Sequence, residues 1–388
     1  METAVLCKYD TRHIQIYIFS GSDEAGRIGA GILVAQIIPQ ALQASLCACG
    51  LNENEYDLSF LEHPERIPFF DDPAILAQLI SVGAGNAVML YRSEELCRSV
   101  NRRFSRYVLE HTYSLQIDMV ITPMTDSFRH DYMMLYRKID IASNRACISH
   151  PLAPLPIVET ESATGNPVSG YDARTGETVS LETLFKRERT PCGHAPVDAA
   201  EGLAYIHIDG NDMSLTVSRI MSSIEEYRTG IAAIRKLTAC ITNTYLCALE
   251  DIEKALCMRY GNCNRVFRRL NIGGDDVNLL CSAEIAYDAA DLFAKRVSET
   301  PLWQNDDTGT IPLSVSVGIA FVNEEIPYRM GQTLSDACCE TAKAFAKSRR
   351  KNGFVENYVY ASHFRNANDG SWIKCDCRDD QPFKIPKE

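Results

Sequence analysis

Two short stretches of the chain are rich in apolar residues placed at every second position, and each stretch leads through a polar turn into a long helical stretch. The first stretch is His13–Phe19 and the second is Leu203–Asp209. Alternation with a period of two predicts a β-strand, whereas the segments that follow have the spacing of a helix. The pattern therefore predicts a strand followed by a helix in each half of the chain.

A turn between two apolar runs occurs later in each half. The first turn is Gly83–Asn86 and the second is Gly273–Asp276. Turn residues between apolar runs indicate a β-hairpin. Gly83 follows Phe19 by 64 residues, and Gly273 follows Asp209 by the same 64 residues. The equal spacing predicts that the two halves are an internal repeat.

Each hairpin is followed by a helical stretch, a further strand and a further helix. The last strands are predicted at Leu115–Ile121 and Leu313–Phe321. The order strand, helix, hairpin, helix, strand is that of a split βαβ, or ferredoxin-like, unit. The sequence therefore predicts an α+β protein with two ferredoxin-like (βαββαβ) domains that form a pseudo-dimer within one chain.

A segment rich in proline and glycine separates the halves. The predicted organisation is a first domain at 1–150, a linker or small insert at 151–200, a second domain at 201–365 and a polar tail at 366–388. A chain of 388 residues with 46% hydrophobic residues is long enough for two domains with their own cores.

Composition limits the compartment and the partners. Glutamines and Pro39 interrupt the longest apolar stretch, Ile28–Cys49, which predicts a buried core helix and no membrane association. The first nine residues do not have the pattern of a signal peptide. Several of the fifteen cysteines, among them Cys47, Cys240 and Cys281, lie inside apolar segments as reduced cysteines do, which indicates a cytoplasmic protein. The net charge of −12 makes long nucleic acid an unlikely partner.

Three aspartates are predicted to converge in the second domain. The carboxyl end of the first ferredoxin-like strand lies beside the turn that begins the third, which places Asp209 next to Asp275 and Asp276. Carboxylates this close repel one another unless a cation lies between them. Oxygen ligands with no nearby His or Cys favour Mg²⁺ or Mn²⁺ over Zn²⁺. The simpler alternative is a surface turn with solvated aspartates.

Glycines and basic residues near these aspartates suit phosphate binding. Gly273 and Gly274 fit a tight turn, where the missing Cβ permits a positive φ and lets a triphosphate approach the backbone. In the helix predicted from about residue 334 to 351, one stripe is formed by Lys343, Lys347 and Arg350. That stripe could hold phosphates, and a solvated basic face is its ordinary alternative.

Three arginines precede the glycine turn: Arg265, Arg268 and Arg269. Because alternation along a strand sends neighbouring side chains to opposite faces, at most some of them are expected to reach the site.

These motifs resemble a known family, the large polymerase-like subunit of type III CRISPR effectors. The motifs similar to its second palm domain are Ile206–Asp209, Asn271–Asp276, Leu313–Phe321 and the helix that carries Lys343. Its first palm domain is resembled by Ile14–Phe19, Gly26–Gly31 and Gly83–Asn86. The resemblance implies that the second palm binds two metal ions and converts ATP into cyclic oligoadenylate messengers, which a downstream effector would sense in antiviral defence.

The chain also departs from that family. The first predicted strand leaves no room for an N-terminal HD nuclease domain. Cys192 and His194 are the only remnant of a zinc module between the palms, and two ligands cannot make a tetrahedral site. Asn211 stands where many relatives have a second aspartate. We therefore expect a compact, stand-alone relative.

The expected mechanism is two-metal nucleotidyl transfer. The two Mg²⁺ or Mn²⁺ ions would be held by Asp209, Asp275 and Asp276, where they would activate a ribose hydroxyl and stabilise the leaving pyrophosphate of an NTP, most simply ATP. Lys343 and Lys347 would neutralise charge on the phosphates.

The first palm is expected not to catalyse, because Phe19, Gly85 and Asn86 replace the metal ligands. Its turn, through Gly83, Gly85 and Asn86, would instead hold the acceptor nucleotide, and a tight turn without a ligand is the alternative.

Other functions remain open. The chain could be a non-catalytic nucleotide-binding sensor or scaffold, or an enzyme similar to diguanylate cyclases. A template-dependent polymerase is disfavoured by the negative charge and by the lack of a recognisable finger or thumb domain.

Overall fold

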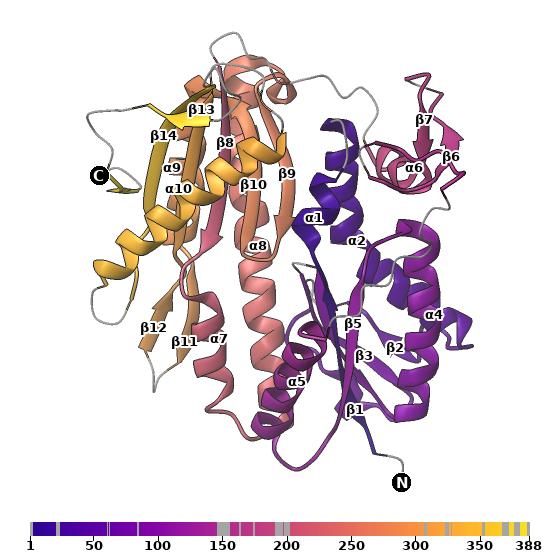
Figure 1. The fold of residues 1–388 in the computed structure, drawn as a ribbon. Helices are drawn as coiled ribbons and strands as arrows, with labels where there is room; N and C mark the ends of the chain where they lie inside the picture. The colour runs from indigo at the N-terminus through magenta and orange to yellow at the C-terminus, as the bar shows by residue number, and fades with distance from the viewer. Residues whose placement is uncertain are drawn as a thin grey trace. The chain divides into compact units, whose positions relative to one another are not determined.

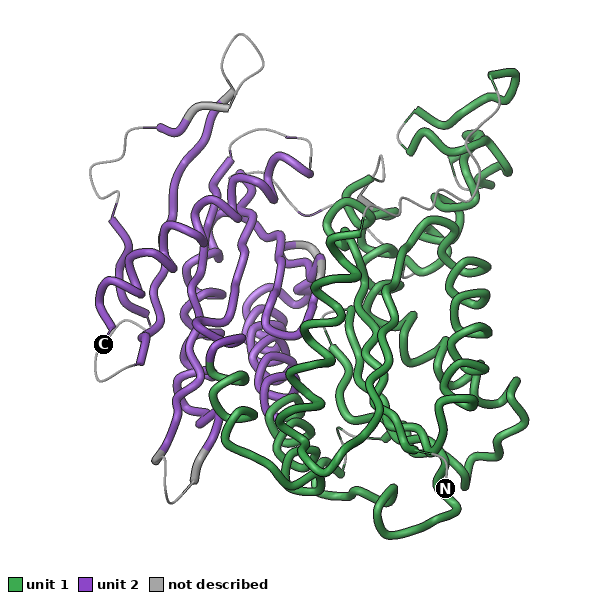
Figure 2. Tube along the Cα trace, turned by 60° about the horizontal axis from the view of Figure 1, so that its bottom comes forward, with its two compact units in different colours: residues 1–192, 216–239 green, residues 193–215, 240–388 purple. Residues whose placement is uncertain are grey.

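The computed structural model describes most of the chain, which forms two compact units (Figures 1 and 2). Unit 1 comprises residues 1–192 and 216–239, and unit 2 comprises residues 193–215 and 240–388. The described residues are 3–20, 24–59, 61, 63–83, 85–145, 156–162, 164–173, 175–190, 197, 202–305, 309–322, 326, 328–350, 354–366, 372–375 and 381–385.

The sheet of unit 1 has the ferredoxin-like strand order. Its strands lie in the order β2-β3-β4-β1-β5, which is the 4-1-3-2 order with one short strand added at an edge. The elements are β1 (Val5–Thr11), α1 (Ile14–Phe19), α2 (Glu24–Ala48), β2 (Tyr56–Asp57), α3 (Pro68–Asp71), β3 (Ala77–Gly83), β4 (Asn86–Tyr91), α4 (Glu94–Thr112), β5 (Ile117–Pro123) and α5 (Phe128–Ser143).

The sheet of unit 2 repeats this order and extends it. Its strands lie in the order β15-β14-β13-β8-β10-β9, and β16 also pairs with β14. Helices α7 (Met213–Met221) and α8 (Tyr227–Tyr260) follow the first strand of this sheet, and their residues between 216 and 239 belong to unit 1. The other elements of unit 2 are β8 (Leu203–Gly210), η1 (Cys263–Arg265), β9 (Phe267–Gly273), β10 (Asp276–Ser282), η2 (Ala283–Ile285), α9 (Ala286–Ser298), β11 (Pro301–Asn305), β12 (Gly309–Pro312), β13 (Val315–Val322), α10 (Tyr328–Ser348), β14 (Tyr358–Asn366), β15 (Trp372–Lys374) and β16 (Phe383–Lys384). The prediction of two ferredoxin-like units is confirmed.

The predicted first strand, however, is wrong. His13–Phe19 holds the helix α1, and the first strand is Val5–Thr11. Residues 5–9 are all buried because β1 lies in the centre of the sheet between β4 and β5, whereas Ile16 is 64% exposed. Burial on both faces of a central strand removes the alternation that would mark it, and a short alternating run fits a helix equally well.

The equal spacing of 64 residues therefore does not mark equivalent positions. In unit 1 the cross-strand partner of Asn86 is Asp10, and in unit 2 the partner of Asp276 is Asp209. Asp10, not Phe19, is thus the counterpart of Asp209. The first unit keeps one acidic residue at this position and has Asn86 in place of the second.

The long apolar segment forms α2, which packs against α4 and against α6 (Leu181–Glu188). Within the described residues, Ala25–Ala48 is the one helix long and apolar enough to cross a membrane, and 56% of its apolar window is buried inside the structure. Its packing agrees with the predicted core helix.

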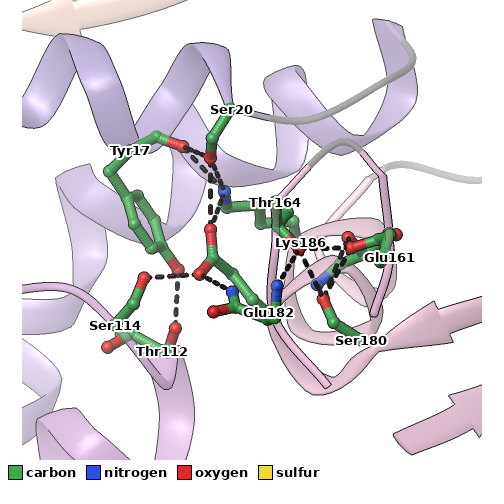
Figure 3. A network of polar contacts seen from close by, with 11 residues as sticks. Tyr17, Ser20, Thr112, Ser114, Glu161, Thr164, Ser180, Glu182 and Lys186 are labelled. Atoms are coloured by element: carbon green, nitrogen blue, oxygen red, sulfur yellow. Dashed lines mark hydrogen bonds and ion pairs between the residues drawn. The ribbon is translucent and has the colours of Figure 1, made fainter. Parts of the chain in front are cut away.

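Part of the predicted insert is a folded element of unit 1. A hairpin of β6 (Val168–Tyr171) and β7 (Thr178–Ser180) leads into α6. Figure 3 shows the polar network that ties α6 to α1, in which the fully buried Lys186 ammonium bonds to Glu182 at 2.5 Å and to the Tyr17 carbonyl at 2.7 Å. Cys192 and His194 lie outside the described residues.

Helix α10 covers one face of the second sheet over β8, β13 and β14 (Figure 1). Gly318 in β13 permits this close packing, because a Cβ there would lie 2.1 Å from the Cys339 nitrogen and 2.2 Å from the Ser335 carbonyl oxygen. The position of α10 places its side chains at the end of β8.

Candidate functional site

The three aspartates of unit 2 lie together where β8 ends and β10 begins. Asp209 and Asp276 are direct cross-strand partners, and the Gly210 amide donates to the Asp275 carbonyl at 3.0 Å. Gly274 has a φ of 63°, which closes the turn in the left-handed region. The predicted neighbourhood of the three residues is therefore found in the structure.

Asp209 is bound by a lysine from α10. The Lys343 ammonium forms an ion pair with its Oδ2 atom, and the two side chains are 17% and 23% exposed. Burial raises the pKa of Asp209, and the hydrogen bond from Lys343 acts in the opposite direction. The pKa of Lys343 is raised, because its bond to Asp209 outweighs its own burial. The ion pair thus partly offsets the cost of burying the Asp209 carboxylate.

Asp276 is bound by a histidine that the sequence analysis missed. His207 Nε2 lies 3.2 Å from Asp276 Oδ1, and His207 Nδ1 lies 2.5 Å from Asp336 Oδ1. Burial alone would lower the pKa of His207, but the hydrogen bonds to Asp276 and Asp336 raise it to about 10. His207 is therefore cationic at neutral pH. The expectation that no His lies near the carboxylates is wrong.

The position of His207 in the sequence could have predicted its place beside the aspartates. His207 precedes Asp209 by two positions on the same strand, so both side chains point to the same face of the sheet. Asp336 on α10 could not be found in this way, because only tertiary packing brings it to the strand.

Asp275 carries the least compensated charge of the three. Burial, followed by the negative charge of Asp209, raises its pKa to about 6. Among the described residues, no ion pair joins Asp275 to a basic side chain within 4 Å. An added cation would gain most from this carboxylate.

The fit of a metal ion rests on these charges. The described part of the chain holds no group of three or more His, Cys, Asp or Glu side chains already arranged to hold a metal ion. Asp209 and Asp276 bond instead to Lys343 and His207. The donors are nonetheless carboxylate oxygens, the ligands that Mg²⁺ and Mn²⁺ prefer, and the pKa of Asp275 is raised first by burial and then by the negative charge of Asp209. The residues therefore fit a hard divalent cation.

The other predicted basic residues differ in position. Lys347 is exposed, one turn beyond Lys343 on α10. Arg350 forms an ion pair with Asp212, whose φ of 51° places it in the left-handed region directly after β8. Arg269 pairs with Glu253 on α8 at 2.6 Å.

Asn211 forms hydrogen bonds with Ser316 in β13 and with the Glu356 carbonyl. Its Oδ1 accepts a hydrogen bond from Ser316 at 2.8 Å, and its side chain is largely buried against β13. The expected loss of a metal ligand at this position stays a prediction.

The turn of unit 1 is tight. Gly85 has a φ of 73°, and a Cβ there would lie 2.6 Å from Ile14 Cδ1. Gly83 and Asn86 close the hairpin as cross-strand partners. The positive φ and the close approach of Ile14 explain why a glycine occupies position 85 even if the turn binds no ligand. Nucleotide binding by Gly83, Gly85 and Asn86 therefore stays a prediction.

The comparisons with known proteins concern the fold. No family model and no curated protein matches the sequence. A Csm1–Csm4 cassette in complex with cA4 matches with a TM-score of 0.55 and 12% identity, over 95% of this chain and 55% of that chain. Csm1 of T. onnurineus matches with a TM-score of 0.56 and 11% identity, over 89% and 52%. A cassette in complex with AMPPNP matches with 0.53 and 13%, over 88% and 53%. The chain spans about half the length of these Csm1 chains, and its fold is similar to theirs.

Proposed function

We propose that the chain is a metal-dependent nucleotidyltransferase that joins nucleoside triphosphates, most readily ATP, into cyclic oligonucleotides. The observation that carries the proposal is the cross-strand pair of Asp209 and Asp276 with Asp275 in the adjoining turn and Lys343 on Asp209. The similar Csm1 structures, whose descriptions name cA4, AMPPNP and ATP, support it at the level of the fold.

The carboxylates of Asp209, Asp275 and Asp276 would hold two Mg²⁺ or Mn²⁺ ions. Such ions lower the pKa of a ribose hydroxyl and neutralise the triphosphate from which pyrophosphate leaves. The sheet fixes the separation of Asp209 and Asp276, because they are cross-strand partners on the neighbouring strands β8 and β10. Asp275 directly precedes Asp276 in the turn.

Lys343 and Arg350 are the residues best placed to receive phosphates. Each is bound to an aspartate at the end of β8, Lys343 to Asp209 and Arg350 to Asp212. A metal ion on Asp209 would free the ammonium to contact a phosphate oxygen, a charge-assisted bond of about 1.5–3 kcal/mol. Lys347, which is exposed, would contribute less.

We also propose that the turn of unit 1 holds the acceptor nucleotide through Gly83, Gly85 and Asn86. Gly85→Phe would disturb the turn itself, because even a Cβ at Gly85 is too close to Ile14. Asn86→Ala is therefore the sharper test. It should slow product formation and leave Mn²⁺ binding in unit 2 unchanged.

We place this reaction in the cytoplasm, with the product sensed by a downstream effector in antiviral defence. A reducing compartment suits the cysteines, all of which are free among the described residues.

A non-catalytic nucleotide sensor is the second candidate, and one observation favours it. Lys343 and His207 already neutralise two of the three carboxylates without any metal ion. In a sensor, the triphosphate would bind while these ion pairs stay closed.

Mass spectrometry of reaction products separates the two candidates. The protein would be incubated with each NTP and with all four, in Mg²⁺ or Mn²⁺. We expect cyclic oligoadenylate from the wild-type protein and none from the double variant Asp275→Asn, Asp276→Asn. Asp288→Asn, an exposed aspartate on α9, is the matched control and should keep full activity. Bound ATP that is recovered intact, with no product under any condition, would indicate the sensor.

A further inference from the structure

Five side chains beside the candidate site form a closed ring of polar contacts. His207 joins Asp276 at 3.2 Å to Asp336 at 2.5 Å. Gln332 Nε2 donates to Asp336 Oδ1 at 2.5 Å and also to Asn278 Oδ1. Asn278 Nδ2 donates to Asp276 Oδ1 at 2.9 Å, which closes the ring.

The ring joins three elements that are distant in sequence. His207 belongs to β8, Asn278 and Asp276 belong to β10, and Gln332 and Asp336 belong to α10. His207 and Asn278 are cross-strand partners, so the sheet fixes their separation. The remaining contacts depend on where α10 lies on the sheet.

On the buried side of the ring, water cannot replace the hydrogen bonds of Asn278 and Gln332 without a loss of stability. Asn278 is 0% exposed and Gln332 is 3% exposed, so a broken bond there would leave a buried amide unsatisfied. The outer half, Asp336 and Asp276, is 40% and 34% exposed. The buried amides of Asn278 and Gln332 thus hold the partly exposed carboxylates of Asp276 and Asp336 in place.

The orientation of the imidazole is determined by Asp336. Both ring nitrogens of His207 face carboxylate oxygens: Nδ1 is hydrogen-bonded to Asp336 Oδ1, whereas Nε2 is buried and lies 3.2 Å from Asp276 Oδ1 without the geometry of a hydrogen bond. Gln332 holds Asp336 in place, and Asp336 in turn fixes the imidazole so that Nε2 faces Asp276 Oδ1. Asn278 donates to Asp276 Oδ1, and the imidazole lies against the same oxygen, so these two contacts restrict the rotation of the Asp276 carboxylate.

We propose that Asp336 is a positioning residue that acts through His207 to hold the Asp276 carboxylate in the orientation that receives a divalent cation. The inference rests on the proposed function, because it assigns a task to Asp336 only if Asp276 is a ligand. Lys343, which binds Asp209, lies two turns further along the same helix. The position of α10 therefore affects the surroundings of both Asp276 and Asp209.

Mn²⁺ titration of the nucleotide-free protein, read as free Mn²⁺ by electron paramagnetic resonance, tests the inference. Asp336→Asn keeps the size of the side chain and removes the charge that holds the imidazole. We expect the Mn²⁺ dissociation constant to rise about 10-fold or more, as when an outer partner of a metal ligand is lost. The control is Thr333→Ala on the exposed face of α10, which should stay within about 2-fold.

A double-mutant cycle shows whether Asp336 acts through His207. If it does, His207→Gln combined with Asp336→Asn loses no more Mn²⁺ affinity than His207→Gln alone, whereas independent effects would add. Circular dichroism and thermal unfolding of each variant report on folding separately.

Two results would overturn the inference. Unchanged or tighter Mn²⁺ binding by Asp336→Asn, with binding by the wild-type protein intact, would show that the ring is structural or that His207 competes with the cation, and the proposed function would stand. A wild-type protein that binds no Mn²⁺ would overturn both proposals.

Discussion

Asp10 in β1 is the cross-strand partner of Asn86, at the register position where unit 2 pairs Asp209 with Asp276. The two sheets are therefore equivalent in topology and different in charge. Asp10 also lies opposite Asp118 in β5, whereas Asp209 lies opposite Ser316 in β13. In unit 1 Arg12 forms an ion pair with Asp118 and Lys8 lies 3.6 Å from Asp10, so basic residues of β1 and of the turn after it neutralise these aspartates, whereas in unit 2 Lys343 of α10 pairs with Asp209.

Asp275→Asn should stabilise the metal-free protein at neutral pH. The pKa of Asp275 is raised from 3.8 to about 6 in the folded state, so its contribution to stability is full below pH 3.8 and is lost as pH rises through 6. Asparagine does not ionise, so the variant does not lose this stability as the pH rises. We expect its free energy of unfolding to exceed that of the wild type by about 1–2 kcal/mol at pH 8, less than the full shift implies because the site is partly solvated.

Urea denaturation at pH 8 and pH 4 without metal measures this difference. The gain should vanish at pH 4, where the wild-type carboxyl is protonated. Asp288→Asn is the control and should show no comparable gain at either pH. An Asp275→Asn variant that is less stable than the wild type at pH 8 would show that the carboxylate is well compensated in the folded state.

Lys343→Met should weaken the binding of ATP more than that of adenosine. Loss of a charge-assisted bond to phosphate corresponds to about 10- to 150-fold in affinity. Lys347→Met, on the exposed side of the same helix, should change ATP affinity by less than about 3-fold because its charge stays solvated. Isothermal titration with ATP and with adenosine gives both values, and an equal loss for the two ligands would indicate a disturbed helix instead.

Glu182→Gln should destabilise unit 1 strongly. The substitution leaves the Lys186 ammonium, which is 0% exposed, without its carboxylate partner. Breaking a buried pair in this way costs about 3–5 kcal/mol. Denaturant unfolding measures the loss, and Glu250→Gln, which removes the exposed partner of Lys254, is the control with an expected cost below about 1 kcal/mol. A Glu182→Gln cost as small as the control's would mean that the ammonium is solvated.

Gly318→Ala should displace α10 and with it both sides of the candidate site. The added Cβ would meet helix backbone, which cannot move aside as a flexible side chain can. We expect a loss of stability of about 1–3 kcal/mol, as for other overpacked cores, together with weaker Mn²⁺ binding. Thermal unfolding and Mn²⁺ titration provide the two measurements. Gly50→Ala is a control for the added methyl group, since nothing lies within 4 Å of its Cβ position and only its positive φ of 89° opposes the change.

A stable Gly318→Ala variant with normal Mn²⁺ affinity would contradict this prediction. It would show that the added Cβ is accommodated without displacing Asp336 and Lys343, both of which belong to α10.

The sequence by itself determined the hairpins, the ferredoxin-like order of unit 2 and the convergence of three aspartates. These features follow from local turn chemistry and from the antiparallel pairing of the first and third strands, which fixes Asp209 beside Asp276 once the order is known.

Only the tertiary structure decided the first strand of unit 1 and the charges around the site. Val5–Thr11 is a strand because it lies between β4 and β5, and a strand buried on both faces has no alternation to reveal it. Likewise Asp336 reaches His207 because α10 packs over Gly318. Contacts between a helix and a strand more than 100 residues apart depend on packing geometry, which no local pattern of residues encodes.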